Sequence, residues 1–137
     1  MKKLINTSFV YAILAMIGGV FYREFTKFNG FVGKTALSVV HTHLFMLGMV
    51  FFLLVLLLAK QYKELIENKR FKLFYYTYNV GLILATAMFI WRGILQVLGT
   101  NISSGLNASI SGMAGIGHIL LGVGIIIFFT ILKKQEK

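Results

Sequence analysis

The composition of this 137-residue chain excludes most classes of water-soluble protein. Hydrophobic residues make up 58% of the chain and charged residues 13%, proline is absent, and the mean hydropathy is +0.81. A soluble domain could not bury that much apolar surface. The chain also has no cysteine, which excludes disulfides, iron–sulfur clusters, thiolate zinc sites and covalent c-type haem attachment.

The net charge of +10 indicates a membrane surface rather than nucleic acid. Most basic residues stand in short clusters at the ends of apolar runs, not along one helical face or a basic arm. Such clusters are typical of cytoplasmic loops that meet anionic headgroups. We therefore expect the lipid bilayer, and no nucleic acid, as the partner of this chain.

Four apolar runs are each long enough for the roughly 20 residues of a membrane-spanning helix. The first follows Lys2 and Lys3 and is interpreted as an uncleaved span, because no small-x-small cleavage site follows it. Polar and apolar residues do not alternate, which argues against strands. The sequence predicts an all-α membrane protein, a single four-transmembrane-helix bundle over residues 1–137. Its spans are expected at 4–22, 35–59, 73–98 and 112–132.

The distribution of basic residues predicts the orientation of the bundle. The side with both termini and the second loop carries ten basic residues, against three on the other side. The positive-inside rule then places both termini in the cytoplasm (N-in/C-in) of a multi-pass protein of the cytoplasmic, or plasma, membrane. The ten residues are Lys2, Lys3, Lys60, Lys63, Lys69, Arg70, Lys72, Lys133, Lys134 and Lys137.

Only His41, His43, Arg92 and His118 are strongly polar, ionisable side chains well inside the apolar runs. Such residues cost several kcal/mol in a bilayer unless they are paired or face an interior, so they mark a candidate site. His41 and His118 each lie about six residues, or ~9 Å, from the outer ends of their spans, and Arg92 lies at a similar depth. The predicted topology therefore places these residues in one layer.

His41 and His43 point about 200° apart on a helix, so both cannot face one cofactor. The face of His41 also carries Ser38, Phe45 and Gly48, whereas His43 shares a bulky apolar face suited to lipid or tight packing. We expect His41 to face the interior of the bundle.

His118 shares its face with Ser111, Gly115 and Gly122, which leaves room beside the imidazole for a flat group. Paired with His41, it predicts a bis-histidine site for haem b. Arg92 and Gln96 would then meet the haem propionates.

Other interpretations of the same residues stay open. The histidines and Arg92 could form a cofactor-free cluster of hydrogen bonds between helices, or Arg92 could extend to the headgroups. Ala108-Gly112 and Ser111-Gly115 could allow close helix contact. A copper or zinc site of the three histidines is less supported, because no carboxylate lies within a span.

The segment from Val40 to Gly48, which contains His-Thr-His, resembles the second helix of the haem-copper oxidase catalytic-subunit superfamily. It is most similar to the His-Thr-Asn stretch of C-type oxidases and nitric oxide reductases, and this resemblance implies that His41 is an axial haem ligand. The superfamily has about three times as many helices and further histidines, so catalysis at a binuclear centre is not expected. Two features of the superfamily remain possible for this chain: a low-spin haem site, or a homo-oligomer of four-helix units that imitates the larger bundle.

The whole chain also resembles a family of small four-span bacterial membrane proteins of unknown function. The leading hypothesis from the sequence is a b-type haem-binding membrane protein for electron transfer or gas sensing, with an unidentified redox partner. The alternatives are a cofactor-free structural or accessory protein and a copper- or zinc-binding membrane protein. The sequence does not indicate whether a reaction is catalysed.

Overall fold

A computed structural model describes residues 1–135 of the chain, and within them every regular element is a helix. Lys137, one of the predicted cytoplasmic residues, lies outside this range. The second span is divided into four consecutive helical segments, and a short helix follows it. The elements are α1 (Lys2–Phe28), η1 (Ala36–Val39), α2 (Val40–His43), η2 (Leu44–Val50), α3 (Phe51–Gln61), α4 (Glu64–Glu67), α5 (Lys69–Leu98) and α6 (Ser104–Leu132).

Four helices are long and apolar enough to cross a membrane: α1, the continuous η1–α3 span, α5 and α6. This confirms the predicted all-α fold with four transmembrane helices. The helix ends differ from the expected spans, most clearly in α6, which begins at Ser104. The uncharged segment before residue 112 is helical because the Ser103 hydroxyl accepts a hydrogen bond from the Leu106 amide at 3.1 Å and caps the helix.

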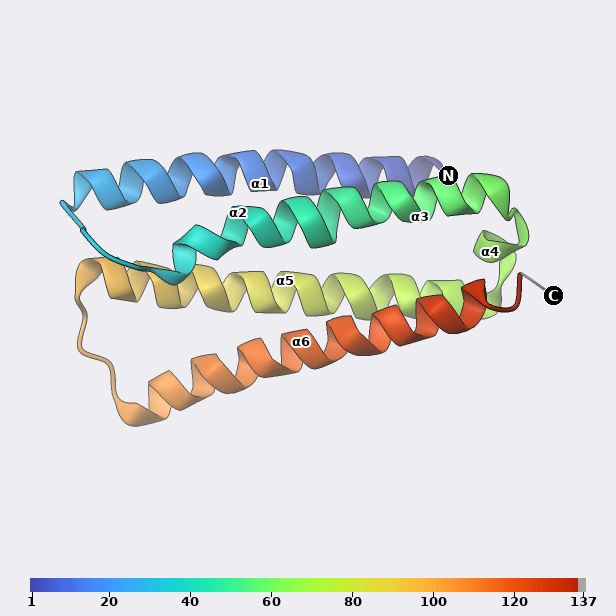
Figure 1. Cartoon of the computed structure of the whole chain (residues 1–137). Helices are drawn as coiled ribbons and strands as arrows, with labels where there is room; N and C mark the ends of the chain where they lie inside the picture. The colour runs from blue at the N-terminus through green and yellow to red at the C-terminus, as the bar shows by residue number, and fades with distance from the viewer. Residues whose placement is uncertain (136–137) are drawn as a thin grey trace.

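The four spans run side by side, with α5 between the η1–α3 span and α6 in the view of Figure 1. Helix α1 packs against the η1–α3 span, and α6 packs along α5. The start of α1 and the end of α6 lie at the end of the bundle that carries α4. The side of the membrane on which this end lies remains a prediction from the basic residues.

An aromatic cluster fills the core in the half of the bundle nearest α4. The Phe51 and Tyr78 rings stack with centroids 4.5 Å apart, and Phe52 and Phe74 are fully buried beside them. The Tyr78 hydroxyl donates to the Leu47 carbonyl at 2.9 Å, so its polar end is satisfied inside the membrane region. This cluster joins α5 to the second span.

Helices α5 and α6 approach closely at glycines that the sequence did not single out. A Cβ atom on Gly81 would lie 2.7 Å from the Gly117 carbonyl oxygen, and one on Gly117 would lie 2.7 Å from the Ala85 nitrogen. Only glycine allows backbones so near each other. The glycines of the predicted Ala108-Gly112 and Ser111-Gly115 pairs have no atom within 4 Å of such a Cβ, so neither pair makes this contact among residues 1–135.

The second span is irregular where it enters the bundle. It starts as the 3-10 helix η1, and the Thr35 hydroxyl donates to the Gly93 carbonyl of α5 at 3.0 Å. It later widens into the π-helix η2, in which Gly48 lies against the Tyr11 ring of α1. Short π-helical segments are frequent at functional sites, and this one directly follows the two histidines.

Candidate histidine site

The two histidines of the second span face different neighbours. His43 meets His118 of α6, with ring centroids 6.1 Å apart and planes at 87°. His41 lies against α1, where a Cβ on Gly19 would be 3.7 Å from the His41 Cβ and the Tyr22 ring stacks at 6.5 Å. The structure therefore pairs His43, and not the expected His41, with His118.

This revision has a simple geometric cause. His41 does face a helix–helix interface, as its glycine-bearing face indicates, but the neighbour there is α1. The opposite face of the same helix turns His43 toward α5 and α6. Side chains two residues apart on a helix serve two different interfaces, and the sequence does not say which neighbour lies on which side.

Hydrogen bonds determine which nitrogen of each paired imidazole is free. The Nδ1 atom of His43 lies 2.9 Å from the Val39 carbonyl oxygen, and Nδ1 of His118 lies 2.8 Å from the Ala114 carbonyl oxygen. A carbonyl only accepts, so each Nδ1 carries the proton and each neutral ring keeps its lone pair on Nε2. This is the tautomer that a metal-binding histidine with a second hydrogen-bond partner adopts.

His41 differs from this pair, because its Nδ1 is buried and has no hydrogen-bond partner among residues 1–135. An unsatisfied polar atom of this kind is costly in a membrane. The notch formed by Gly18 and Gly19 of α1 accommodates the ring, but no described group there bonds to its Nδ1.

Phe89 of α5 completes the group and was not anticipated from the sequence. Its ring lies edge-on to both imidazoles, with centroids 5.0 Å from His43 and 5.6 Å from His118. Phe89 precedes Arg92 by three residues and so shares its face of α5. This spacing from Arg92 was the one feature of the sequence that could have indicated Phe89. Aromatic residues are frequent throughout this chain, however, so the spacing does not distinguish Phe89 from the others.

Arg92 lies near the histidine pair but is bonded to α6. It donates to the Asn107 side-chain oxygen at 2.9 Å, to the Asn107 carbonyl at 3.2 Å and to the Ser111 hydroxyl at 2.7 Å. Ser111 precedes His118 by two helical turns, or about 10 Å. Asn107, which the sequence analysis missed, is one turn before Ser111 and so continues the face of His118.

Gln96 has a structural contact instead of joining Arg92. Its side-chain oxygen accepts a hydrogen bond from the Ala36 amide at 2.7 Å. This bond satisfies a free amide at the start of η1. Gln96 therefore helps to attach the second span to α5, and the propionate contact stays a prediction from the sequence.

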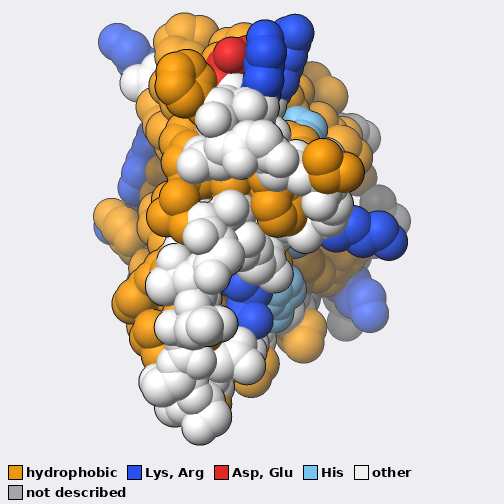
Figure 2. Space-filling model, turned by 90° about the vertical axis from the view of Figure 1, so that its left-hand side faces the viewer, with side chains coloured by type: hydrophobic (Ala, Val, Ile, Leu, Met, Phe, Trp, Pro, Cys, Tyr) orange, Lys and Arg blue, Asp and Glu red, His pale blue; other side chains and the backbone are white. Residues whose placement is uncertain are grey.

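The α6 face beside His118 is open within the described part of the chain, as expected for Gly115 and Gly122. A Cβ on either glycine would meet no atom within 4 Å, and the His118 side chain is exposed. Figure 2 looks onto the end of the bundle near this site and shows a histidine beside a lysine or arginine side chain. The arrangement offers two imidazoles, a cation and a bare helix face.

No group of three or more His, Cys, Asp or Glu side chains within residues 1–135 could hold a metal ion. The three-histidine copper or zinc site therefore is not assembled in the described part of the chain. Axial coordination of haem needs only two histidines, because the macrocycle supplies the other ligands.

Together these features define an all-α protein with four potential membrane spans and a histidine pair joining the second and fourth. The chain belongs to the family described as "Protein of unknown function (DUF2871)", whose model matches residues 1–135. No curated protein and no solved structure matches the chain.

Proposed function

We propose that this protein binds haem b in the cytoplasmic membrane, with His43 and His118 as axial ligands, and serves electron transfer or gas sensing. The observation that carries the proposal is the pairing of these two imidazoles, each with Nδ1 bonded to a carbonyl and Nε2 free. Bound haem would supply a one-electron couple, and a gas would bind its iron only by displacing one of the two histidines. His43 takes the role that the sequence analysis assigned to His41.

The separation of the rings supports this pairing. Metal–nitrogen bonds are about 2 Å long, so imidazoles on opposite sides of one metal ion have ring centres roughly 6 Å apart. The centroids of His43 and His118 are 6.1 Å apart. The spacing of the two imidazoles thus suits one iron, whereas the Phe89 ring, which contacts both imidazoles, would have to move aside to admit the macrocycle.

The exposure of His118 supports the presence of a further group on this face. An imidazole that faces hydrocarbon with an unpaired nitrogen is costly. The neighbouring Gly115 and Gly122 leave the α6 surface bare. A flat, apolar macrocycle would cover this surface and use the free nitrogen.

Arg92 supplies the charge that haem propionates need. Its guanidinium is about two helical turns from His118, at the end of the bundle where propionates would reach the membrane surface. Asn107 and Ser111 hold the guanidinium in place. Arginine binds carboxylates through paired, charge-assisted hydrogen bonds.

An absorption spectrum of the detergent-purified protein, reduced minus oxidised, tests the proposal. After expression with haem supplied, we expect a b-type α-band that His43→Ala and His118→Ala each abolish. His41→Ala is the matched control and should retain the band, because His41 faces α1. Absence of the band in the unmodified protein would contradict haem binding. Loss of the band only in His41→Ala would identify His41 as the axial ligand, as the sequence predicts.

A cofactor-free accessory protein is the second candidate, and the contacts of Arg92 favour it. Three hydrogen bonds to Asn107 and Ser111 already join the guanidinium to α6. The cluster can thus hold α5 and α6 together without propionates. In that case the spectrum would show no band, whereas Arg92→Met would still lower the melting temperature.

A further inference from the structure

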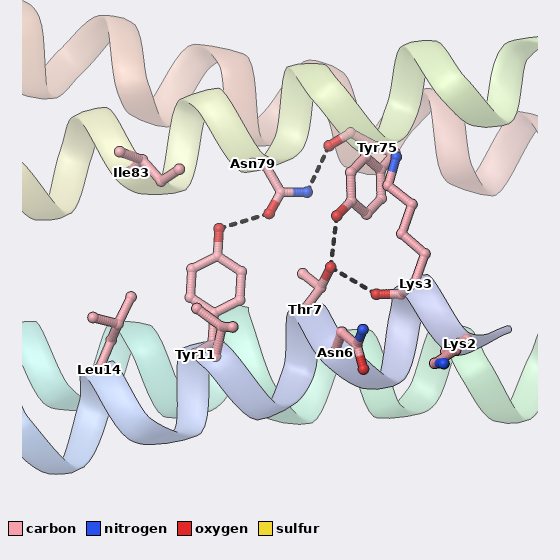
Figure 3. A pocket seen from close by; sticks show the side chains of 10 residues that line it. Lys2, Lys3, Asn6, Thr7, Tyr11, Leu14, Tyr75, Asn79 and Ile83 are labelled. Carbon is pink, nitrogen blue, oxygen red and sulfur yellow. Dashed lines mark hydrogen bonds between the residues drawn. The ribbon is translucent and has the colours of Figure 1, made fainter.

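A groove runs between α1 and α5 on the side of the bundle away from α6. Its first part has a volume of about 570 Å³, and Figure 3 shows the side chains that line it. A second, almost wholly apolar hollow of about 340 Å³ shares Tyr11, Leu14 and Ile83 with the first. The two form one groove that extends from Lys2 and Lys3 at the α4 end of the bundle.

The mouth of the groove carries several lysines, and the two carboxylates of α4, Glu64 and Glu67, lie at the same end of the bundle without forming a described ion pair with them. Lys2 and Lys3 line it, and Lys72 lines an adjoining hollow together with Lys3. Within residues 1–135 the one ion pair joins Arg23 and Glu24, far along α1 from this mouth. No described carboxylate pairs with the three ammonium groups, so they attract an anion to this mouth.

Aromatic rings position one of these ammonium groups. Lys3 Nζ lies 4.0 Å from the Tyr75 ring centroid and 4.8 Å from that of Tyr76, and it donates to the Tyr76 hydroxyl at 3.5 Å. Cation–π contacts hold the side chain over α5. Lys3 is thus directed across the groove toward α5.

Four polar side chains within the groove, those of Thr7, Tyr11, Tyr75 and Asn79, take part in hydrogen bonds between α1 and α5 or within α5. Thr7 and Tyr11 point from α1 toward α5, where Thr7 Oγ1 lies 2.6 Å from the Tyr75 hydroxyl (Figure 3). The Tyr11 hydroxyl donates to the Asn79 side-chain oxygen at 2.6 Å, and the Asn79 amide donates to the Tyr75 carbonyl at 2.7 Å. These bonds satisfy the polar groups, so that an apolar chain can lie along the groove.

We propose that this groove binds one anionic phospholipid of the inner leaflet. Its phosphate would contact Lys2 and Lys3, and an acyl chain would lie along Leu14 and Ile83 toward the apolar hollow. Lys3 and Leu14 are about 16 Å apart along α1, close to the half-thickness of ~15 Å of a bilayer's hydrocarbon core. Charge complementarity at the mouth selects an anionic headgroup over a zwitterionic one.

Native mass spectrometry can test this site with the intact protein released from vesicles of equal phosphatidylglycerol and phosphatidylcholine. We expect retained lipid to be enriched in phosphatidylglycerol, and Lys2→Gln with Lys3→Gln to reduce this enrichment by roughly 5-fold per lysine. Lys133→Gln with Lys134→Gln is the matched control, because it removes the same charge from the end of α6. Equal losses in both double variants, or none in either, would contradict the proposal.

The acyl chain requires a separate measurement. Leu14→Trp with Ile83→Trp should fill the groove and reduce retention of phosphatidylglycerol, whereas Leu54→Trp, on the exposed side of α3, should not. Glycerol phosphate, which has no acyl chain, should not displace the retained lipid. Displacement by glycerol phosphate, or full retention in the groove-filling variant, would mean that the lipid does not lie in the groove.

Discussion

Single atoms decide the geometry of the histidine pair. His43 and His118 are alike because each uses Nδ1 to bond the carbonyl four residues earlier, which leaves Nε2 for a partner. His41 lacks such a bond. The glycines of α6 also differ in their surroundings. A Cβ on Gly117 would contact the α5 backbone, whereas a Cβ on Gly115 would have no described atom within 4 Å. Residue type alone therefore does not indicate role.

At the residue scale, Gly81→Ala and Gly117→Ala should each destabilise the protein. The added Cβ would lie 2.7 Å from backbone atoms of the facing helix, and overpacking of this kind costs about 1–3 kcal/mol. Circular dichroism in detergent should show a lower melting temperature. Gly115→Ala is the control and should melt at or above the original temperature, because the site is open and alanine favours helix. A similar decrease in all three variants would argue against this close contact.

The second span shows how one element is assembled from unlike parts. Its 3-10 entry, η1, is attached to α5 through Thr35 and Gln96, and its π-helical segment, η2, brings Gly48 against Tyr11. The histidines lie between these irregular segments. Because the helix is anchored on both sides of them, the rings have little freedom to rotate toward other neighbours.

At the scale of this element, Thr35→Val should loosen the start of the second span. The substitution removes the hydrogen bond to the Gly93 carbonyl and the cap on the Leu37 amide, a loss of about 1–2 kcal/mol. Hydrogen exchange should become faster at residues 36–39. Thr26→Val is the control, because the Thr26 hydroxyl bonds only to carbonyls of its own helix. An unchanged hydrogen-exchange rate at residues 36–39 in Thr35→Val would show that the Gln96 bond alone is enough to attach η1 to α5.

The two ends of the bundle carry different groups of residues. One end carries α4, the start of α1 and the aromatic core, whereas the other carries the histidine pair and Arg92. The histidine pair and the lysine mouth of the groove therefore lie in opposite halves of the bundle. The predicted orientation assigns the lipid groove to the inner leaflet and the histidine pair to the outer half.

At the scale of the whole molecule, labelling of single cysteines tests the orientation. The chain has no cysteine of its own, so Asn101→Cys and Lys63→Cys each introduce one exposed thiol at opposite ends of the bundle. A membrane-impermeant maleimide should label Asn101→Cys in intact cells and Lys63→Cys only after permeabilisation, as the positive-inside rule predicts. The reverse pattern would place the termini outside and move the histidine pair to the inner half.

The sequence by itself determined the number and type of the spans and the polar residues within them. Length and hydropathy are properties of one segment, so they need no knowledge of its neighbours. It also indicated that Gly115 and Gly122 lie on the face of His118.

Only the tertiary structure decided that His43, and not His41, meets His118. It also decided that Gln96 caps η1, and that Gly81 and Gly117 form the close helix contact. These outcomes depend on which helix lies beside which face, and that arrangement results from the packing of all four spans together. A helix face whose residues are suited to packing does not by itself indicate which neighbouring helix packs against it.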